Sequence, residues 1–210
     1  SFERVDTIRF VIDDDPTFQW LTTVDTTAFE RIFIYIDANV QRIWGARLEH
    51  ALASHRNPRF WMPIEPLESS KSMAFYPEAL AFLEQHGAGR FDLVIAIGGG
   101  IVIDLVSFQT STYMRGLPFF AIPSTLVGQM DASTAGKTCL NTDSAKNLLG
   151  TFYYPRVVYN NVELLRTNSK YYLRQGYSEI FKYGLLRSRQ LISLLEDHHR
   201  SGVQIGVDIR

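Results

Sequence analysis

Hydrophobic residues in the first three-quarters of the chain fall into two kinds of pattern. Short apolar runs typical of strands occupy residues 7–13, 31–37, 59–64, 91–97 and 118–123. The run FDLVIAI at 91–97 is nearly continuous, which is typical of a strand buried on both faces of a sheet. Residues 38–55, 71–87 and 100–112 have helical spacing, although Pro77 is expected to mark a break in the second. This alternation predicts an α/β fold with a mostly parallel sheet and helices on both faces.

The pattern changes near residue 160, after which the sequence is helical throughout. We therefore expect an α/β domain over residues 1–160 and the beginning of a helical domain over residues 161–210. About 50 helical residues form a thin layer for a separate core, so the helical domain is expected to be truncated.

Composition excludes several classes of function. The chain has 46% hydrophobic and 20% charged residues and a formal net charge of −1, so it has no general attraction to nucleic acid or to anionic membranes. The single cysteine, Cys139, cannot form an internal disulfide, which fits a reducing compartment. We see no apolar run long enough to span a bilayer and no signal-peptide core in the first ten residues, so a cytoplasmic location is expected.

The stretch GGGIVID at 98–104 predicts a tight turn between a strand and a helix. Glycines let backbone N–H groups approach a ligand closely, and the start of a helix offers free N–H donors, so the turn suits a pyrophosphate. It is not the dinucleotide motif G-x-G-x-x-G, because residue 103 is isoleucine, and a purely structural turn is the alternative. Asp104 is costly to bury without a partner, so we expect it to cap the helix or to accept a hydrogen bond from a ligand.

Residues 113–147 hold a denser group of polar side chains. Separated cations, an amide and hydroxyls suit a phosphorylated, polyhydroxylated ligand, although a solvated loop is the common alternative. The segment AGKT at 135–138 is not a phosphate-binding P-loop, because residue 131 is aspartate where that motif requires glycine. The candidate residues are Arg115, Ser124, Thr125, Asp131, Lys137, Lys146 and Asn147.

The stretch GYSEIFKYG at 176–184 places Glu179 and Lys182 on one helical face. Two interpretations stay open: a surface ion pair, or a glutamate metal ligand beside a substrate-binding lysine. None of the five histidines has H-x-x-x-H or H-x-x-H spacing. His198 and His199 are adjacent and are expected to point to different helical faces, where solvation is the usual fate.

These motifs, in this order, resemble 3-dehydroquinate synthase and the related sugar phosphate cyclases. The resemblance extends from about residue 31 to 187 and is strongest at 98–141, in AKNLLGTFYYP at 145–155 and in GYSEIFKYG. It implies a Rossmann-like α/β domain followed by a helical domain, with NAD and a divalent metal, usually zinc, in the cleft between them. It also implies a homodimer and a small-molecule sugar phosphate substrate.

The reaction implied by the resemblance is the conversion of 3-deoxy-D-arabino-heptulosonate 7-phosphate to 3-dehydroquinate with loss of phosphate, a step of the shikimate pathway. NAD oxidises a ring hydroxyl transiently and is regenerated, which makes catalysis largely a matter of positioning. The metal lowers the pKa of that hydroxyl.

The resemblance also assigns roles to individual residues. Arg115 is expected to reach the substrate phosphate across a dimer interface, and Glu179 to bind the metal. The family's two metal-binding histidines lie later than the end of this chain, so the chain is expected to bind NAD without turning over substrate. The expected cofactor contacts are Asp37, Asn39, Glu68, Lys71, Gly99, Gly100, Ile101, Asp104, Ser124, Thr125, Asp131, Lys137 and Lys146; the expected catalytic or substrate contacts are Lys137, Asn147, Lys182 and Arg115.

Departures from the family pattern leave alternatives open. Ile103 and Ser107 stand where glycine is common, and RTNSKYYL at 166–173 replaces the usual stretch. Gly136 and Lys137 favour 3-dehydroquinate synthase over relatives that cyclise sedoheptulose 7-phosphate. The alternatives are such a divergent cyclase, a non-catalytic NAD-binding module, and an iron-dependent alcohol dehydrogenase, which the motifs fit less well.

Overall fold

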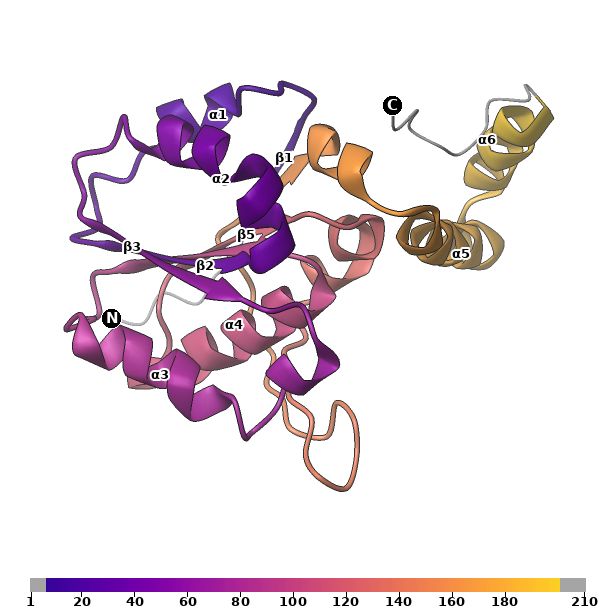
Figure 1. Ribbon diagram of the computed structural model, residues 1–210. Helices are drawn as coiled ribbons and strands as arrows, with labels where there is room; N and C mark the ends of the chain where they lie inside the picture. Colours follow the sequence, from indigo (N-terminus) through magenta and orange to yellow (C-terminus); the bar gives the residue numbers. More distant parts are fainter. Residues whose placement is uncertain (1–6, 201–210) are drawn as a thin grey trace.

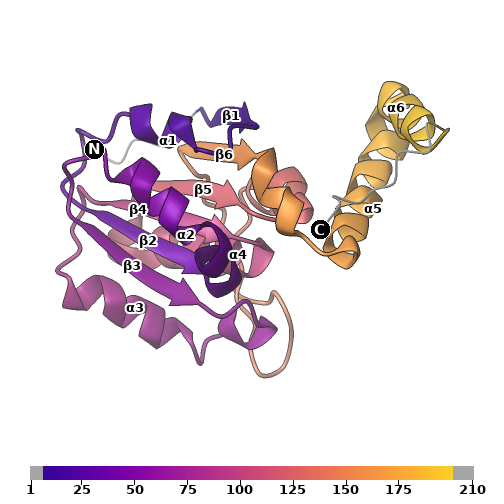
Figure 2. The same cartoon turned by 45° about the horizontal axis from the view of Figure 1, so that its top comes forward.

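The computed structural model describes residues 7–200, apart from the side chains of His198 and His199. The described strands form one sheet in which all neighbouring strands are parallel, in the order β1-β6-β5-β4-β2-β3 (Figure 2). The α/β prediction is therefore confirmed. The strands are β1 (Arg9–Asp13), β2 (Ile32–Asp37), β3 (Arg59–Ile64), β4 (Leu93–Gly98), β5 (Phe119–Pro123) and β6 (Val157–Asn161).

Helices cover both faces of the sheet. The short α1 (Gln19–Thr23) and the longer α2 (Ala38–Leu52) lie on one face, and α3 (Tyr76–Gln85) and α4 (Gly100–Thr112) lie on the other (Figure 1). Successive strand residues point to opposite faces, so a strand covered on both sides is apolar throughout. All six residues of β2 and of β4 are accordingly buried.

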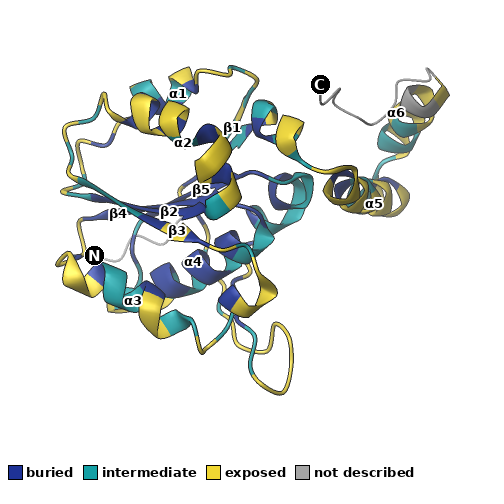
Figure 3. Ribbon diagram, viewed as in Figure 1, coloured by how far each residue is buried: buried dark blue, intermediate teal, exposed yellow. Residues whose placement is uncertain are grey.

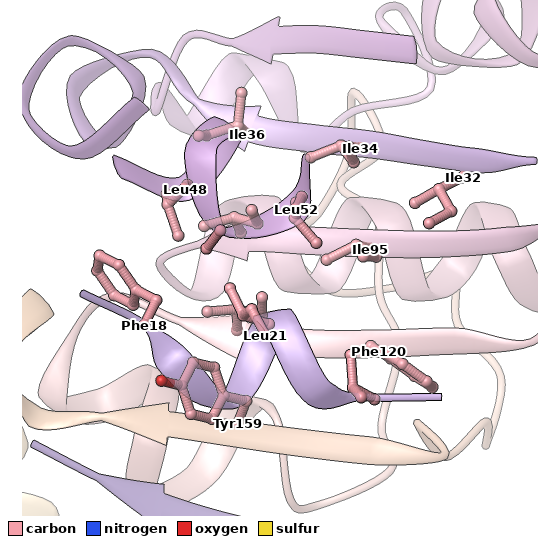
Figure 4. Packing of buried hydrophobic residues seen from close by; sticks show 14 of the residues in the cluster. Phe18, Leu21, Ile32, Ile34, Ile36, Leu48, Leu52, Ile95, Phe120 and Tyr159 are labelled. Carbon is pink, nitrogen blue, oxygen red and sulfur yellow. The ribbon is translucent and has the colours of Figure 1, made fainter. Parts of the chain in front are cut away.

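Two hydrophobic clusters fill the space between the helices and the sheet. On one face, Leu21, Leu48 and Leu52 pack against strand residues that include Ile34 and Ile95 (Figure 4). On the other face, α3 and α4 pack onto the alternate strand residues, which include Phe33, Tyr35, Val94 and Ala121. These clusters fix the positions at which the strands end, and the candidate site lies at those ends.

The helix predicted over 71–87 is wrong at its start. Helix α3 begins at Tyr76, and Pro77 occupies its first turn, where the missing N–H costs no hydrogen bond. The preceding residues follow a short 3₁₀ helix, η1 (Glu68–Ser70), and then pair with a distant loop: Met73 donates its backbone N–H to the Asn141 carbonyl at 3.2 Å. Strand β6 and helix α1 are further elements that the sequence pattern did not reveal.

The described residues after β6 are helical, as expected. They form η4 (Val162–Thr167), α5 (Lys170–Arg187) and α6 (Arg189–Arg200), and α5 and α6 project away from the sheet (Figure 1). Much of their surface is exposed (Figure 3), including Phe181, Leu185 and Leu186. The division into two domains near residue 160 stays a prediction. Within residues 7–200, no helix combines the length and the hydropathy that a membrane crossing needs.

Candidate functional site

The candidate site lies at the carboxyl ends of β2 and β4. Strands β2 and β4 are neighbours in the sheet. From β2 the chain continues outward to β3 on one side, whereas from β4 it continues outward to β5 on the other side. Open α/β sheets bind ligands outside the carboxyl ends of the strands at such a reversal, and we refer to this region, around the ends of β2 and β4, as the crevice. Asp37 ends β2 and Gly98 ends β4, and a Cβ added to Gly98 would lie 3.1 Å from the Asp37 Cβ. The two strand ends therefore meet with no room for a side chain between them.

Asp37 has a structural role that was not expected from the sequence. Its Oδ1 accepts hydrogen bonds from the backbone N–H groups of Asn39 at 2.8 Å and Val40 at 3.3 Å, so it caps the N-terminus of α2. Burial raises the pKa of Asp37, and these two N–H donors partly offset the effect. The side chain of Asn39 is exposed and accepts a hydrogen bond from Arg42.

The glycine turn forms the second wall of the crevice. Gly99 is the N-cap residue of α4, and no side chain in the described part of the molecule caps this helix. The N–H groups of the first turn, from Gly100 and Ile101 onward, therefore point to the crevice without a side-chain acceptor. A Cβ added to Gly99 would lie 3.0 Å from Thr125 Cγ2, which leaves room for backbone alone. Free N–H groups at a helix start favour an anionic group at this position.

Asp104 neither caps α4 nor remains without a partner, which corrects the first of the two options left open for it. Its Oδ2 accepts a hydrogen bond at 3.0 Å from the Nζ of Lys71, which is itself buried. The same ammonium group donates to Asn147 Oδ1 at 2.7 Å and lies 3.7 Å from Cys139 Sγ. One lysine therefore joins three segments of the chain that are distant in sequence: its own, that of Asp104 and the loop that holds Cys139 and Asn147.

The pKa values of this pair follow from burial and from their mutual attraction. Burial raises the pKa of Asp104, and the Lys71 ammonium beside it offsets only part of that rise. Burial alone would lower the pKa of Lys71, but the Asp104 carboxylate, with smaller contributions from Cys139 and Glu68, raises it. Lys71 is therefore held as a cation at neutral pH.

A loop over residues 136–153 carries further candidates to the crevice. It is held at its base by pairing between Leu140 and Leu149 and is attached to η1, where Asn141 donates its side-chain amide to Glu68 Oε1 at 2.7 Å. Asn147 has a left-handed backbone (φ 55°), which brings its side chain back to Lys71. The two lysines of this loop, Lys137 and Lys146, are exposed, and Lys146 Nζ lies 3.9 Å from the same Glu68 oxygen.

Asp131 connects the crevice to the helical part of the chain. It lies in a single π-helical turn, η3 (Gly128–Ala132), a rare feature that often marks functional positions. Its Oδ1 accepts a hydrogen bond at 3.0 Å from the hydroxyl of Tyr183 on α5. On the same helix, Lys182 forms an ion pair with Glu179, which raises the pKa of Lys182. Lys182 Nζ also lies 5.1 Å from the centroid of the Tyr183 ring, so Tyr183 links Asp131 to the Lys182–Glu179 pair.

Three predicted residues differ in how they meet the crevice. Ser124 is buried behind it and donates its backbone N–H to the Gly98 carbonyl at 2.8 Å. Thr125 Oγ1 accepts a hydrogen bond from the Gly128 N–H at 3.1 Å, so it shapes the following turn. Arg115 is exposed at the far end of α4, about 20 Å from the glycine turn for a helix of this length. Arg115 is therefore not brought together with the other residues.

The described residues do not by themselves form a metal site. Within the described part of the chain, no three His, Cys, Asp or Glu side chains come together in a way that could hold a metal ion. Glu179 is paired with Lys182, and the side chains of His198 and His199 lie outside the described residues. A cavity of about 620 Å³ lies at the amino ends of β2 and β3, opposite the crevice. Its polar residues bond largely with one another, as Thr26 does with Asn57 at 2.8 Å.

Cys139, Asn141 and Tyr183 contact the predicted residues but were not identified from the sequence. All three lie inside or next to the motifs singled out above, which is the only signal the sequence carries for them. Their partners are distant in sequence, so no local spacing could have identified the contacts.

Comparisons with known proteins identify relatives of this chain. The family described as 3-dehydroquinate synthase N-terminal matches residues 61–175. A 3-dehydroquinate synthase from Alkaliphilus oremlandii is 40% identical over 170 residues, which are 81% of this chain and 46% of the relative. The chain thus spans about half the length of the curated relatives it matches.

Among solved structures, a 2-epi-5-epi-valiolone synthase from Streptomyces hygroscopicus, with NAD⁺ and Zn²⁺ bound, is similar with a TM-score of 0.84 and 31% identity. The match covers 96% of this chain and 56% of that one. A 2-deoxy-scyllo-inosose synthase complexed with carbaglucose-6-phosphate, NAD⁺ and Co²⁺ has a TM-score of 0.77 over 85% of this chain and 49% of that one; at 20% identity it supports the fold alone.

Proposed function

Because the chain belongs to the 3-dehydroquinate synthase N-terminal family, we propose that it forms the NAD-binding side of a sugar phosphate cyclase active site. The observation that carries this proposal is the uncapped helix start at Gly99, set against a buried carboxylate at the neighbouring strand end. Backbone N–H groups at a helix start bind a diphosphate, and a carboxylate at the end of the neighbouring strand binds ribose hydroxyls. Asp37 keeps one carboxylate oxygen outside its capping bonds for that purpose.

The Lys71 network would lie at the nicotinamide end of the cofactor. Lys71, Asp104 and Asn147 are already held together, so the cofactor would meet a preformed polar wall rather than flexible side chains. Asp131, together with the exposed Lys137 and Lys146, would orient the substrate against the nicotinamide, and the two ammonium groups would bind its anionic groups. NAD supplies the chemistry of taking a hydride from a ring carbon and returning it.

The proposed substrate is 3-deoxy-D-arabino-heptulosonate 7-phosphate, which is cyclised with loss of phosphate to 3-dehydroquinate. Support for this choice comes from the 40% identity to a 3-dehydroquinate synthase and from the Gly136–Lys137 pair. We propose that Glu179 is one ligand of a divalent metal whose other ligands are not among the described residues. We also propose a homodimer in which the exposed Arg115 serves the partner's substrate, since it lies too far from its own crevice to do so.

A second candidate is a cyclase that acts on a different sugar phosphate. The 31% identity to a 2-epi-5-epi-valiolone synthase over 96% of this chain favours it specifically. Calorimetric titration of the NAD-loaded chain with 3-deoxy-D-arabino-heptulosonate 7-phosphate and with sedoheptulose 7-phosphate distinguishes the two. Preference for the second sugar phosphate would replace the proposed substrate and would leave NAD binding intact.

Calorimetric titration of the 210-residue chain with NAD tests the central proposal. The variant Gly99→Val fills the space against Thr125 and is expected to weaken NAD binding by at least about tenfold. The control is Gly89→Ala, where an added Cβ meets nothing closer than 3.9 Å. Gly89 precedes β4, at the end of the strand away from the glycine turn. Wild-type protein that does not bind NAD, or equal NAD binding by both variants, would exclude the proposed diphosphate site at the start of α4.

A further inference from the structure

A hydrogen bond from the hydroxyl of Tyr183 connects α5 to the carboxylate of Asp131. The hydroxyl donates to Asp131 Oδ1 at 3.0 Å, although the two residues are 52 positions apart. Burial raises the pKa of Tyr183, and the bond to the Asp131 carboxylate raises it further. The hydroxyl therefore stays protonated and able to donate at neutral pH.

A second contact holds the same face of α5. Gly176 lies seven residues before Tyr183, which puts the two on one side of the helix. A Cβ added to Gly176 would lie 2.3 Å from Leu126 Cγ, so the helix approaches the segment before the π-turn as closely as a backbone can. Glu179 lies between these two contacts in sequence. Its place relative to the crevice is thus set by one contact on either side of it.

The surface that receives Tyr183 is itself rigidly attached to the sheet. Ser133 donates its N–H to the Gly128 carbonyl at 3.1 Å, five residues back, which closes the wide π-turn around Asp131. Gln129, in the same turn, is buried and donates its amide to the Pro123 carbonyl at 3.2 Å and the Asn161 carbonyl at 3.0 Å. Asp131 is therefore fixed to the ends of β5 and β6, and its hydrogen bond fixes Tyr183 in turn.

We propose that Tyr183 is a positioning residue that orients the Asp131 carboxylate toward the cofactor and sets α5, with Glu179 and Lys182, in register against the crevice. The inference rests on the proposed function, because it assumes that Asp131 faces bound nicotinamide. Lys182 Nζ lies 5.1 Å from the centroid of the Tyr183 ring, so the same residue also contacts the proposed substrate-binding lysine. Tyr183 acts through its neighbours and contacts no reacting atom.

The test is a fluorescence titration of the chain with NADH, which reports both the affinity and the emission maximum of the bound nicotinamide. Tyr183→Phe removes only the hydroxyl and is expected to weaken NADH binding by about tenfold and to move the emission maximum toward that of free NADH. Asp131→Asn is expected to do the same. The double variant should bind no more weakly than either single variant, because both disrupt one unit. The control is Tyr171→Phe on the same helix, where the side chain is exposed.

The outcomes separate the two ideas. If wild-type protein does not bind NADH, the proposed function fails and the positioning role fails with it. If wild-type protein binds but Tyr183→Phe matches Tyr171→Phe in affinity and emission, the positioning role alone is overturned. Additive losses in the double variant, or a loss of affinity without an emission change, would give Tyr183 a merely structural role and would also overturn the proposal.

Discussion

Replacing Lys71 with methionine removes a buried cation from the polar network that joins Asp104 and Asn147. The exposed fraction of the side chain is 8% for Lys71 and 16% for Asp104, and their polar atoms are 3.0 Å apart. The substitution keeps most of the volume but leaves the Asp104 carboxylate and the Asn147 amide oxygen without this donor. Removing one partner of a buried ion pair costs about 3–5 kcal/mol, and we expect the lower end of this range at pH 8 because the Asp104 side chain is partly exposed.

The loss should depend on pH in a direction that the structure determines. The folded-state pKa of Asp104 is already above the ordinary 3.8 because burial outweighs the Lys71 ammonium. Such a group contributes stability below its ordinary pKa and loses that contribution as the pH rises through the folded-state value. Without Lys71 the pKa of Asp104 rises further, so the variant loses stability more steeply between about pH 4 and pH 8. Toward pH 4 a larger share of this carboxyl is neutral in the variant, so the loss should be smaller there, about 1 kcal/mol.

Urea unfolding at pH 4.5 and pH 8, followed by tryptophan fluorescence and circular dichroism, measures these free energies. The matched control is Lys146→Met, because Lys146 also neighbours Glu68 but its side chain is 73% exposed; its loss should stay within about 0.5 kcal/mol at both pH values. The double variant Lys71→Met/Asp104→Leu should recover part of the stability lost at pH 8. Equal losses at both pH values, or a control as unstable as Lys71→Met, would refute the reasoning.

Two further predictions concern the loop that carries Asn147. Gly136→Ala should lower the free energy of unfolding by about 2–4 kcal/mol in a thermal or urea assay, because the φ of Gly136 is +64° and an added Cβ would lie 2.2 Å from Tyr154 Cε1. The control Gly87→Ala, with φ +65° but nothing within 4 Å, should lower it by about 1 kcal/mol. Equal losses would argue against the steric cause. Burial, with a smaller contribution from Asp104, raises the pKa of Cys139 to about 11. Labelling of this thiol by a thiol reagent at pH 8 should therefore be on the order of 100-fold slower than for an ordinary thiol, and Asp104→Asn should speed it. Rapid labelling of the wild type would contradict this environment.

The sheet could be predicted to the extent that burial on both faces is recorded in the sequence itself. Strand β4 (Leu93–Gly98) is apolar throughout and was identified within two residues, and the helix from Gly100 to Thr112 was identified in full. Strand β6 was missed because Asn160 and Asn161 interrupt a run of only three apolar residues. Such a short run carries no reliable periodicity.

The predicted start of α3 and the partner of Asp104 show where local patterns become insufficient. Residues 71–75 have helical spacing, but Lys71 accepts a backbone hydrogen bond from Asn141 and Met73 donates one to it, so pairing with a distant loop prevents the helix. The ammonium group of Lys71 reaches side chains 33, 68 and 76 positions away, at Asp104, Cys139 and Asn147. The free energy of burying an unpaired carboxylate correctly predicts that Asp104 has a partner, but only the tertiary structure identifies that partner as Lys71.

The extra residue in the turn Gly128–Ala132 makes chain length itself a determinant of the direction in which Asp131 points. An α-helix advances by about 100° per residue, so deleting one residue from this turn would rotate whatever follows or precedes it by more than a quarter of a circle. The carboxylate at 131 would then face another direction, although every neighbouring amino acid would be unchanged. Alignments of relatives that differ by one residue at this point would therefore describe different sites, even where all the polar side chains match.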